Sequence, residues 1–247
     1  MHRRQFLVSS AAATSLAAVG SRLSAADTPA DDALRAILRA HDAQIPGLLA
    51  KQERRSGHRG LGGIANEFGI FTVAGTNGFV AALAAAACAP GSKYFGSTEL
   101  AEPMLAGIRY MLKAQHTDGT VDFYATNFHS PPDLAFILEG SCPACTLLRA
   151  SPVPAIAAVA TELGKFITRA GEALVTGGVH TPNHRWVVCA ALAWTNTLFP
   201  DSRYVARIDQ WLAEGIDLDP DGQYTEKSTT VYSPIVDRAL LTVARLL

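Results

Sequence analysis

The sequence is short of the features that mark several protein classes. Only four of its 247 residues are cysteine, which is too few to staple a chain of this length with disulfides. Glycine and proline, at 20 and 13 residues, are too scarce for a collagen-like or low-complexity chain. Basic and acidic residues nearly balance, 21 against 22, so the strong positive charge of a nucleic-acid-binding protein is missing. With 49% hydrophobic residues, the chain is expected to fold around a large core.

The first 26 residues have the layout of a secretory signal peptide. Residues 1–4 form a short basic segment, residues 6–20 are apolar, and Ser24-Ala25-Ala26 supplies small residues at a cleavage position. The Arg3-Arg4 pair favours a twin-arginine signal peptide, read by the twin-arginine export machinery. A membrane anchor is the alternative, but the apolar stretch is shorter than the ~20 residues of a spanning helix. We therefore expect a periplasmic or extracellular protein without a stable membrane anchor.

Removal of this segment would change the charge balance. It takes away Arg3, Arg4 and Arg22 and no acid, which leaves 18 basic residues against 22 acidic ones and a net charge of −4. Such a mature chain is not expected to bind nucleic acid.

Apolar residues downstream recur at every third or fourth position and rarely alternate, which is typical of α-helices. Residues 187–198 are apolar nearly all round, so this helix should belong to an inner layer. We expect an all-α fold with about eight helices. Their predicted ranges are 31–52, 64–88, 99–115, 131–149, 152–174, 183–198, 203–214 and 234–247.

Four short motifs occur twice, in the same order, at separations of 103 to 115 residues. The pairs are Gly62-Gly63 with Gly177-Gly178, residues 90–94 with residues 200–204, Asp118-Gly119 with Asp221-Gly222, and Ser130-Pro131 with Ser233-Pro234. Repeated helical hairpins stack into a solenoid or close into an α/α toroid. Each Ser-Pro pair is predicted to cap a helix. His129 and Tyr232 precede these caps, so both should emerge at one end of the array, where we expect a cleft.

Four segments carry a family resemblance: residues 115–120, 126–133, 180–186 and 221–227. They look like the helical toroid of bacterial heparinase II/III-like and related uronate polysaccharide lyases. The resemblance covers residues 30 to 247. It implies an incomplete (α/α)n toroid built from helical hairpins over residues 27–247, and an exported lyase whose partner is an anionic polysaccharide or oligosaccharide. A closed six-hairpin toroid needs roughly twelve helices, so we expect the chain to be truncated at its C-terminus.

Elimination beside a uronate carboxylate requires a base, a proton donor and a group that neutralises the carboxylate. We expect His184 to be the base or carboxylate partner, Arg185 the carboxylate clamp, and Tyr232 or Tyr224 the proton donor. The candidate catalytic residues are His184, Tyr232, Tyr224 and His129. The candidate substrate-binding residues are Arg185, Asn183, Asn127 and Glu226.

Each candidate also has a purely structural interpretation. Asn183 would cap its helix, Arg185 would pair with an acid on a neighbouring helix, and His184 would belong to the core. The two tyrosines would pack at the rim of the array, and Glu226 would pair with Lys227 or Arg238.

Two other function classes stay open. A toroid glycoside hydrolase would use two carboxylates, and the available acids are Asp118, Asp122, Asp221 and Glu226. A non-catalytic glycan-binding fragment is the second, because the predicted helices are fewer than a closed toroid needs.

Cys142 and Cys145 are spaced like a metal or redox pair, but no second paired motif and no βαβ context accompanies them, so we expect buried thiols. No set of His and carboxylate residues has a recognisable metal-ligand spacing, and the sequence identifies no cofactor. The basic loop with Arg54, Arg55, His58 and Arg59 either meets an anionic polymer or is a solvated linker, and the linker is favoured.

Overall fold

The computed structural model describes residues 29–179 and 181–247, and their fold is mostly helical, as predicted. The predicted signal peptide, residues 1–26, lies outside the described residues. The helices in the described part are α1 (Pro29–Lys51), α2 (Val73–Cys88), α3 (Ala101–Ala114), α4 (Pro131–Arg149), α5 (Pro154–Thr176), α6 (Pro182–Leu198), α7 (Ser202–Ala213) and α8 (Tyr232–Leu246). A 3-10 turn, η1 (Thr98–Leu100), precedes α3, and strands β1 (Ile64–Ala65) and β2 (Phe71–Thr72) form an antiparallel hairpin before α2.

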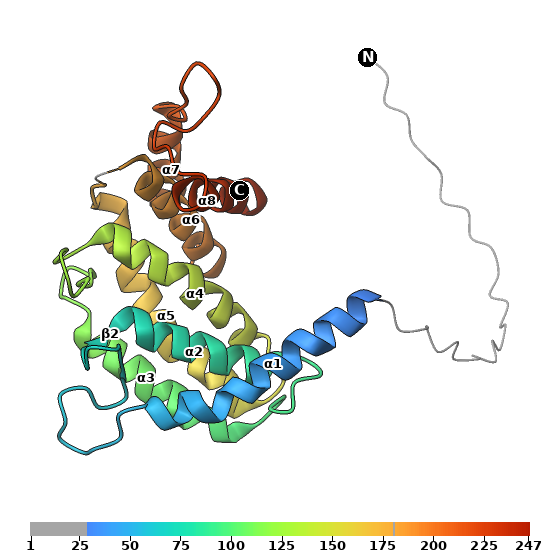
Figure 1. Ribbon diagram of the computed structural model, residues 1–247. Coiled ribbons are helices and arrows are strands. Elements are labelled where there is room, and N and C mark those ends of the chain that lie inside the picture. Colours follow the sequence, from blue (N-terminus) through green and yellow to red (C-terminus); the bar gives the residue numbers. More distant parts are fainter. Residues whose placement is uncertain (1–28, 180) are drawn as a thin grey trace, which may run out of the picture.

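The helices form two layers (Figure 1). In one layer α2, α4, α6 and α8 lie side by side, and in the other α5 packs between α3 and α7. Successive helices run in opposite directions, so the four segments that lead from an odd-numbered to an even-numbered helix emerge at one end of the array. The described residues of these segments are 52–72, 115–130, 177–179 with 181, and 214–231. We call this side the loop end.

Helix α6 lies in the inner layer, as its sequence predicts. Residues 185–193 are all buried, and Trp186 is the largest side chain among them. The doubled motifs also fall on equivalent elements, the first set around α2, α3 and α4 and the second around α6, α7 and α8. None of the helices in the described ranges is long and apolar enough to cross a lipid bilayer.

The helix predicted at residues 64–88 begins only at Val73. The side chain of Asn66 accepts hydrogen bonds from the backbone N–H groups of Phe68 and Ile70, and Gly69 has a φ of +73°. These Asn and Gly residues close the β1–β2 hairpin instead of continuing a helix. Thr72 then caps α2 by accepting from the N–H of Gly75.

The two Ser-Pro pairs differ in the structure. Ser130 caps α4 as predicted, because its hydroxyl accepts from the backbone N–H of Asp133 and Pro131 follows at the first helical position. The prediction for Ser233 is wrong. Helix α8 begins at Tyr232, two residues before the predicted start, and Val231 occupies its N-cap without a side-chain hydrogen bond.

Two buried glutamines fix the loops at the ends of α1 and α3 in the same way. Gln52 donates to the carbonyls of Gly62, at 3.0 Å, and Pro103, at 2.8 Å. Gln115 donates to the carbonyls of Gly119, at 2.8 Å, and Phe166, at 3.2 Å. Each glutamine therefore ties its own loop to the next odd-numbered helix, a repeat that the doubled motifs do not contain.

Three of the four cysteines are buried thiols and Cys88 is partly buried, and none of them forms a disulfide. Cys142 and Cys145 lie in the core on α4, and all four cysteines are free. Burial raises the pKa of Cys142 to about 12, which makes a reactive thiolate unfavourable at neutral pH.

Candidate active site

The loop between α3 and α4, residues 115–130, rests directly on α5. Gly119 has a φ of +85°, and a Cβ placed on it would lie 2.2 Å from the carbonyl oxygen of Arg169. Only glycine satisfies both the left-handed backbone and this close approach. The turn therefore holds the polar residues on either side of it in fixed positions.

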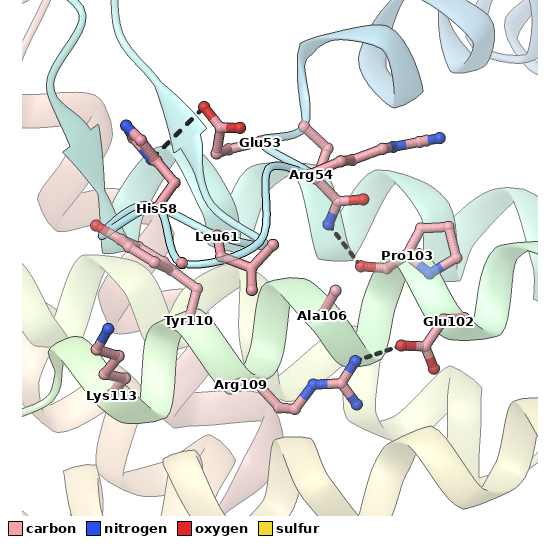
Figure 2. Close-up of a pocket in the computed structure, with 12 residues that line it drawn as sticks. Glu53, Arg54, His58, Leu61, Glu102, Pro103, Ala106, Arg109, Tyr110 and Lys113 are labelled. Atoms are coloured by element: carbon pink, nitrogen blue, oxygen red, sulfur yellow. Dashed lines mark hydrogen bonds and ion pairs between the residues drawn. The ribbon is translucent and has the colours of Figure 1, made fainter.

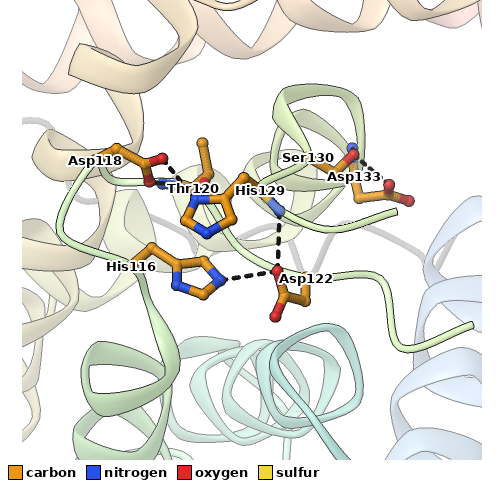
Figure 3. A network of polar contacts seen from close by, with 7 residues as sticks. All are labelled: His116, Asp118, Thr120, Asp122, His129, Ser130 and Asp133. Carbon is orange, nitrogen blue, oxygen red and sulfur yellow. Dashed lines mark hydrogen bonds and ion pairs between the residues drawn. The ribbon is translucent and has the colours of Figure 1, made fainter. Parts of the chain in front are cut away.

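Two histidines and two aspartates meet in this loop (Figure 3). Nε2 of His116 lies 2.8 Å from Oδ1 of Asp122, and Nδ1 of His129 lies 2.7 Å from Oδ2 of Asp118. The two imidazole rings stack with their centroids 3.8 Å apart and their planes 17° from parallel. We call these four residues the His–Asp cluster.

Both aspartates of the cluster are held in the ionised form. The hydroxyl and backbone N–H of Thr120, with the ring of His129, keep the pKa of Asp118 well below its ordinary value of 3.8. Burial works against ionisation of Asp122, but hydrogen bonds from the backbone N–H of His129 and the ring of His116 outweigh it and lower its pKa. Each carboxylate then accepts a proton-bearing nitrogen of one histidine.

This arrangement orients His129. Its Nδ1 faces the ionised Asp118, so the proton resides on Nδ1, and Nε2 makes no hydrogen bond within the described part of the chain. His129 has a φ of +50°, the one non-glycine residue in the described ranges with a positive φ. Strained backbone of this kind is often found at functional sites. Here it lets the backbone N–H of His129 reach Asp122, at 2.9 Å.

Exposed aromatic side chains lie on the same loop as the cluster. Phe123 and Tyr124 are 39% and 38% exposed, and Phe128 is 71% exposed. Asn127, a predicted substrate-binding residue, donates through Nδ2 to Asp133 of α4, at 3.1 Å, and pairs with Phe123 across a β-bridge. In this structure Asn127 positions the loop that presents the aromatic rings.

A second group of predicted residues lies where residues 214–231 meet α6. Both carboxylate oxygens of Glu226 accept from the side chain of Asn183, at 2.9 and 2.8 Å, and one also accepts from its backbone N–H, at 2.6 Å. Asn183 is therefore not the helix cap; that position is Thr181, and the carboxylate of Glu226 satisfies the first turn from a distant loop. The expected pairing of Glu226 with Lys227 or Arg238 is wrong, because Lys227 pairs with Asp219 and Arg238 with Glu139.

Arg185 is engaged within the chain. It is 6% exposed and pairs with Glu214, at 2.8 Å, and with Asp217, and it donates to the carbonyl of Gly215, at 2.9 Å. The structural interpretation, in which Arg185 pairs with acidic residues, thus agrees with the structure. Because two carboxylates already neutralise it, we do not place Arg185 in the candidate site as a clamp for a substrate carboxylate.

The remaining candidates border this second group. Tyr224 donates its hydroxyl to Asp237, at 2.6 Å, and burial together with that carboxylate raises its pKa to about 12. Tyr232 is 42% exposed at the start of α8. His184 is partly buried and meets the ring of Phe136 edge-on at 6.1 Å, so packing links this group to α4.

The structure places the predicted residues in two groups at the loop end rather than in one. His129 and Asn127 belong to the His–Asp cluster region, and the other six lie around α6, the 214–231 loop and α8. Sequence reasoning missed His116 as a site residue and did not pair Asp118 or Asp122 with a histidine. A signal was present, since His116, Asp118, Asp122 and His129 fall within fourteen residues between two helices.

The described residues contain no group of three or more His, Cys, Asp or Glu side chains arranged to hold a metal ion. Comparisons of the chain with protein-family models, with curated proteins and with solved structures find no match.

Proposed function

We propose that this protein is an exported polysaccharide lyase that cleaves a uronic-acid-containing glycan by β-elimination. The observation that carries the proposal is the His–Asp cluster, in which two carboxylates orient two stacked imidazoles at the loop end (Figure 3). Exposed aromatic side chains lie on the same loop. Acid–base chemistry needs histidines held in this way.

The roles follow from the hydrogen bonds. Nε2 of His129 takes the proton beside the uronate carboxylate, and Asp118 keeps the ring in the required tautomer. His116 is paired with Asp122 through Nε2, and its doubly protonated form has a second N–H, on Nδ1, that can donate to the developing negative charge on that carboxylate. An exposed phenol protonates the leaving oxygen. Tyr124, on the same loop, and Tyr232, one of the two tyrosines proposed from the sequence, are the two phenols to compare.

The electrostatics favour a lyase over a glycoside hydrolase. A hydrolase needs one carboxyl group that stays protonated until it donates to the leaving sugar. The pKa values of Asp118 and Asp122 are both lowered, so neither is a suitable acid. Glu226 accepts three hydrogen bonds from Asn183, so both of its carboxylate oxygens are engaged at the start of α6.

The proposal includes a toroidal architecture and export. The two-layer alternation of inner and outer helices is how (α/α) toroids begin, and the described helices supply four consecutive hairpins of such an array. The Arg3-Arg4 signal supports delivery to the periplasm or beyond.

The test is incubation of the protein with a panel of uronate glycans while near-ultraviolet absorbance is followed. Elimination creates a C4=C5 double bond and raises the absorbance. Release of reducing ends without this chromophore would reject the lyase in favour of a hydrolase. Binding without any turnover would favour a glycan-binding protein.

Variants of the cluster sharpen the test. His129→Asn keeps a residue that tolerates a positive φ, and we expect its rate to fall by about 100-fold or more. His41→Gln on α1 is the matched histidine control and should retain the wild-type rate. Equal rates for both variants would remove His129 from the mechanism.

A further inference from the structure

A hollow lies between the loop that follows α1 and the outer face of α3, apart from the His–Asp cluster (Figure 2). Its volume is about 710 Å³, within the ~300–1,000 Å³ of typical ligand sites. An adjoining hollow of about 350 Å³ shares Tyr110 and Lys113 with it. We call the two together the α3 groove. None of the residues assigned to catalysis lines it.

Positive charge is concentrated along the α3 groove. Four cationic side chains line it, against the acids Glu53 and Glu102: the four are Arg54, Arg59, Arg109 and Lys113. Glu102 pairs with Arg109, and Glu53 pairs with Arg55. Arg54, Arg59 and Lys113 form no ion pair within the described part of the chain. The groove is therefore positive although the whole chain carries a net charge of −1.

The cations Lys113 and Arg54 lie on either side of an apolar stretch of the groove. In Figure 2, Lys113 and Tyr110 are at one end and Arg54 is at the other, with Leu61 and Ala106 between. The lining residues of α3 run from Glu102 to Lys113, which corresponds to about 16 Å along the helix axis. An elongated ligand with several negative charges and apolar C–H faces matches this pattern.

The groove is preformed rather than created by a mobile loop. Gly62 has a φ of +85°, and a Cβ on it would lie 2.1 Å from the carbonyl oxygen of Ala106. Gln52 ties the same loop to Pro103 by a hydrogen bond of 2.8 Å. A binding surface whose shape is already fixed loses little conformational entropy when a ligand binds.

We infer that the α3 groove binds a segment of an anionic oligosaccharide, with Lys113, Arg59 and Arg54 facing its acidic groups and Tyr110 and Leu61 facing its sugar rings. The choice of ligand rests on the proposed function. Lys113 precedes His116 by three residues, so a glycan held in the groove can continue toward the His–Asp cluster. The groove thus adds a site for sugar units remote from the cleaved bond.

The test measures binding apart from catalysis. The full protein is titrated in a calorimeter with a galacturonate trimer, a sulfated trimer and a neutral glucose trimer. We expect the acidic trimers to bind, binding to weaken as salt is added, and the neutral trimer to bind at least tenfold more weakly. The tighter of the two acidic trimers then identifies the acidic group as carboxylate or sulfate.

Exposed cations of the groove provide the variants. Lys113→Met and Arg59→Gln should each raise Kd for the preferred acidic trimer by fivefold or more. Lys165→Met, on the outer helix α5, is the matched control and should leave Kd unchanged. An unchanged Kd in Lys113→Met and Arg59→Gln, or equal binding of the neutral trimer, overturns the inference.

The two proposals fail separately. If the trimers bind with the expected variant pattern but no elimination product forms, the lyase proposal is rejected and the binding role of the α3 groove is retained. If elimination occurs but Kd and KM are unaltered in Lys113→Met, the binding role of the groove is rejected and the lyase proposal is retained.

Discussion

The loop that follows α3 and the loop that follows α7 contain the same hydrogen-bonded turn. In the first, the N–H of His116 donates to the carbonyl of Thr120, at 2.9 Å, and the N–H of Gly119 to that of His116, at 3.0 Å. In the second, Asp219 donates to Gln223, at 2.8 Å, and Gly222 to Asp219, at 2.9 Å. The backbone of the repeat is thus preserved across 103 residues.

The two loops use their charged side chains differently. Around the first turn, carboxylates orient two histidines whose side chains are 30% and 56% exposed. Around the second, carboxylates neutralise the buried Arg185 and cap α6. The first loop presents reactive groups to solvent, whereas the charged groups of the second loop form ion pairs and hydrogen bonds with α6. A backbone turn that is repeated in the chain therefore does not have the same role in both copies.

The largest expected effect comes from removing the cation that holds the second loop. Arg185→Met leaves Glu214 and Asp217 without their partner and deprives Gly215 of a donor, so we expect a loss of about 3 kcal/mol in the free energy of unfolding. Urea unfolding measures it. Arg203→Met should lose much less, because the pairs of Arg203 with Glu172 and Asp201 are exposed and screened by solvent. Equal losses would contradict a structural role for Arg185.

The next effect contrasts the two equivalent glycines. Gly119→Ala places a Cβ against the carbonyl of Arg169 at a positive φ, so we expect a loss of about 2 kcal/mol. Gly222→Ala meets no atom within 4 Å at a φ of +79°, so the backbone strain alone costs about 1 kcal/mol. Thermal unfolding of both variants checks the order. A larger loss for Gly222→Ala would show that the first turn does not rest on α5.

Acid should distinguish Asp118 from Asp221, its counterpart in the second turn. The folded pKa of Asp118 is lowered, so its contribution to stability is present above its ordinary pKa of 3.8 and is lost as the pH falls below that value. We expect the wild type to lose more stability than Asp118→Asn between about pH 5 and 2, measured by urea unfolding at each pH. Asp221→Asn is the control at the equivalent position and should follow the wild type.

The smallest expected effect concerns Tyr224. Its folded pKa is raised to about 12, so its contribution to stability is complete below the ordinary value of 10.0 and is lost as the pH rises toward 12. Tyr224→Phe removes the hydrogen bond to Asp237 and should cost about 1 kcal/mol. When the absorbance is followed as the pH is raised, Tyr224→Phe should show one fewer tyrosine ionising near pH 12 than the wild type. We expect elimination to continue in this variant, and a complete loss of activity would return Tyr224 to the catalytic set.

The sequence predicted the helices well and the site in part. The predicted range of α4 matches the observed one, and α6 differs by one residue, because helix formation depends on local periodicity, capping residues and proline position. His129 and Asn127 were placed in a loop beside a capped helix, as observed. The start of α2 was misplaced because a hairpin closed by Asn66 and Gly69 looks apolar enough to continue a helix.

The order of the helical hairpins, the inner position of α6 and the crowding of polar residues in the loops follow from the amino-acid sequence alone. The partners of the charged and polar side chains depend on how the helices pack. Arg185 finds its acids about 30 residues away, Asn183 finds Glu226 43 residues away, and Gln115 reaches α5 51 residues away. Such pairs form because helix packing brings distant backbone segments to one place, whereas a helix itself forms through hydrogen bonds between residues four apart.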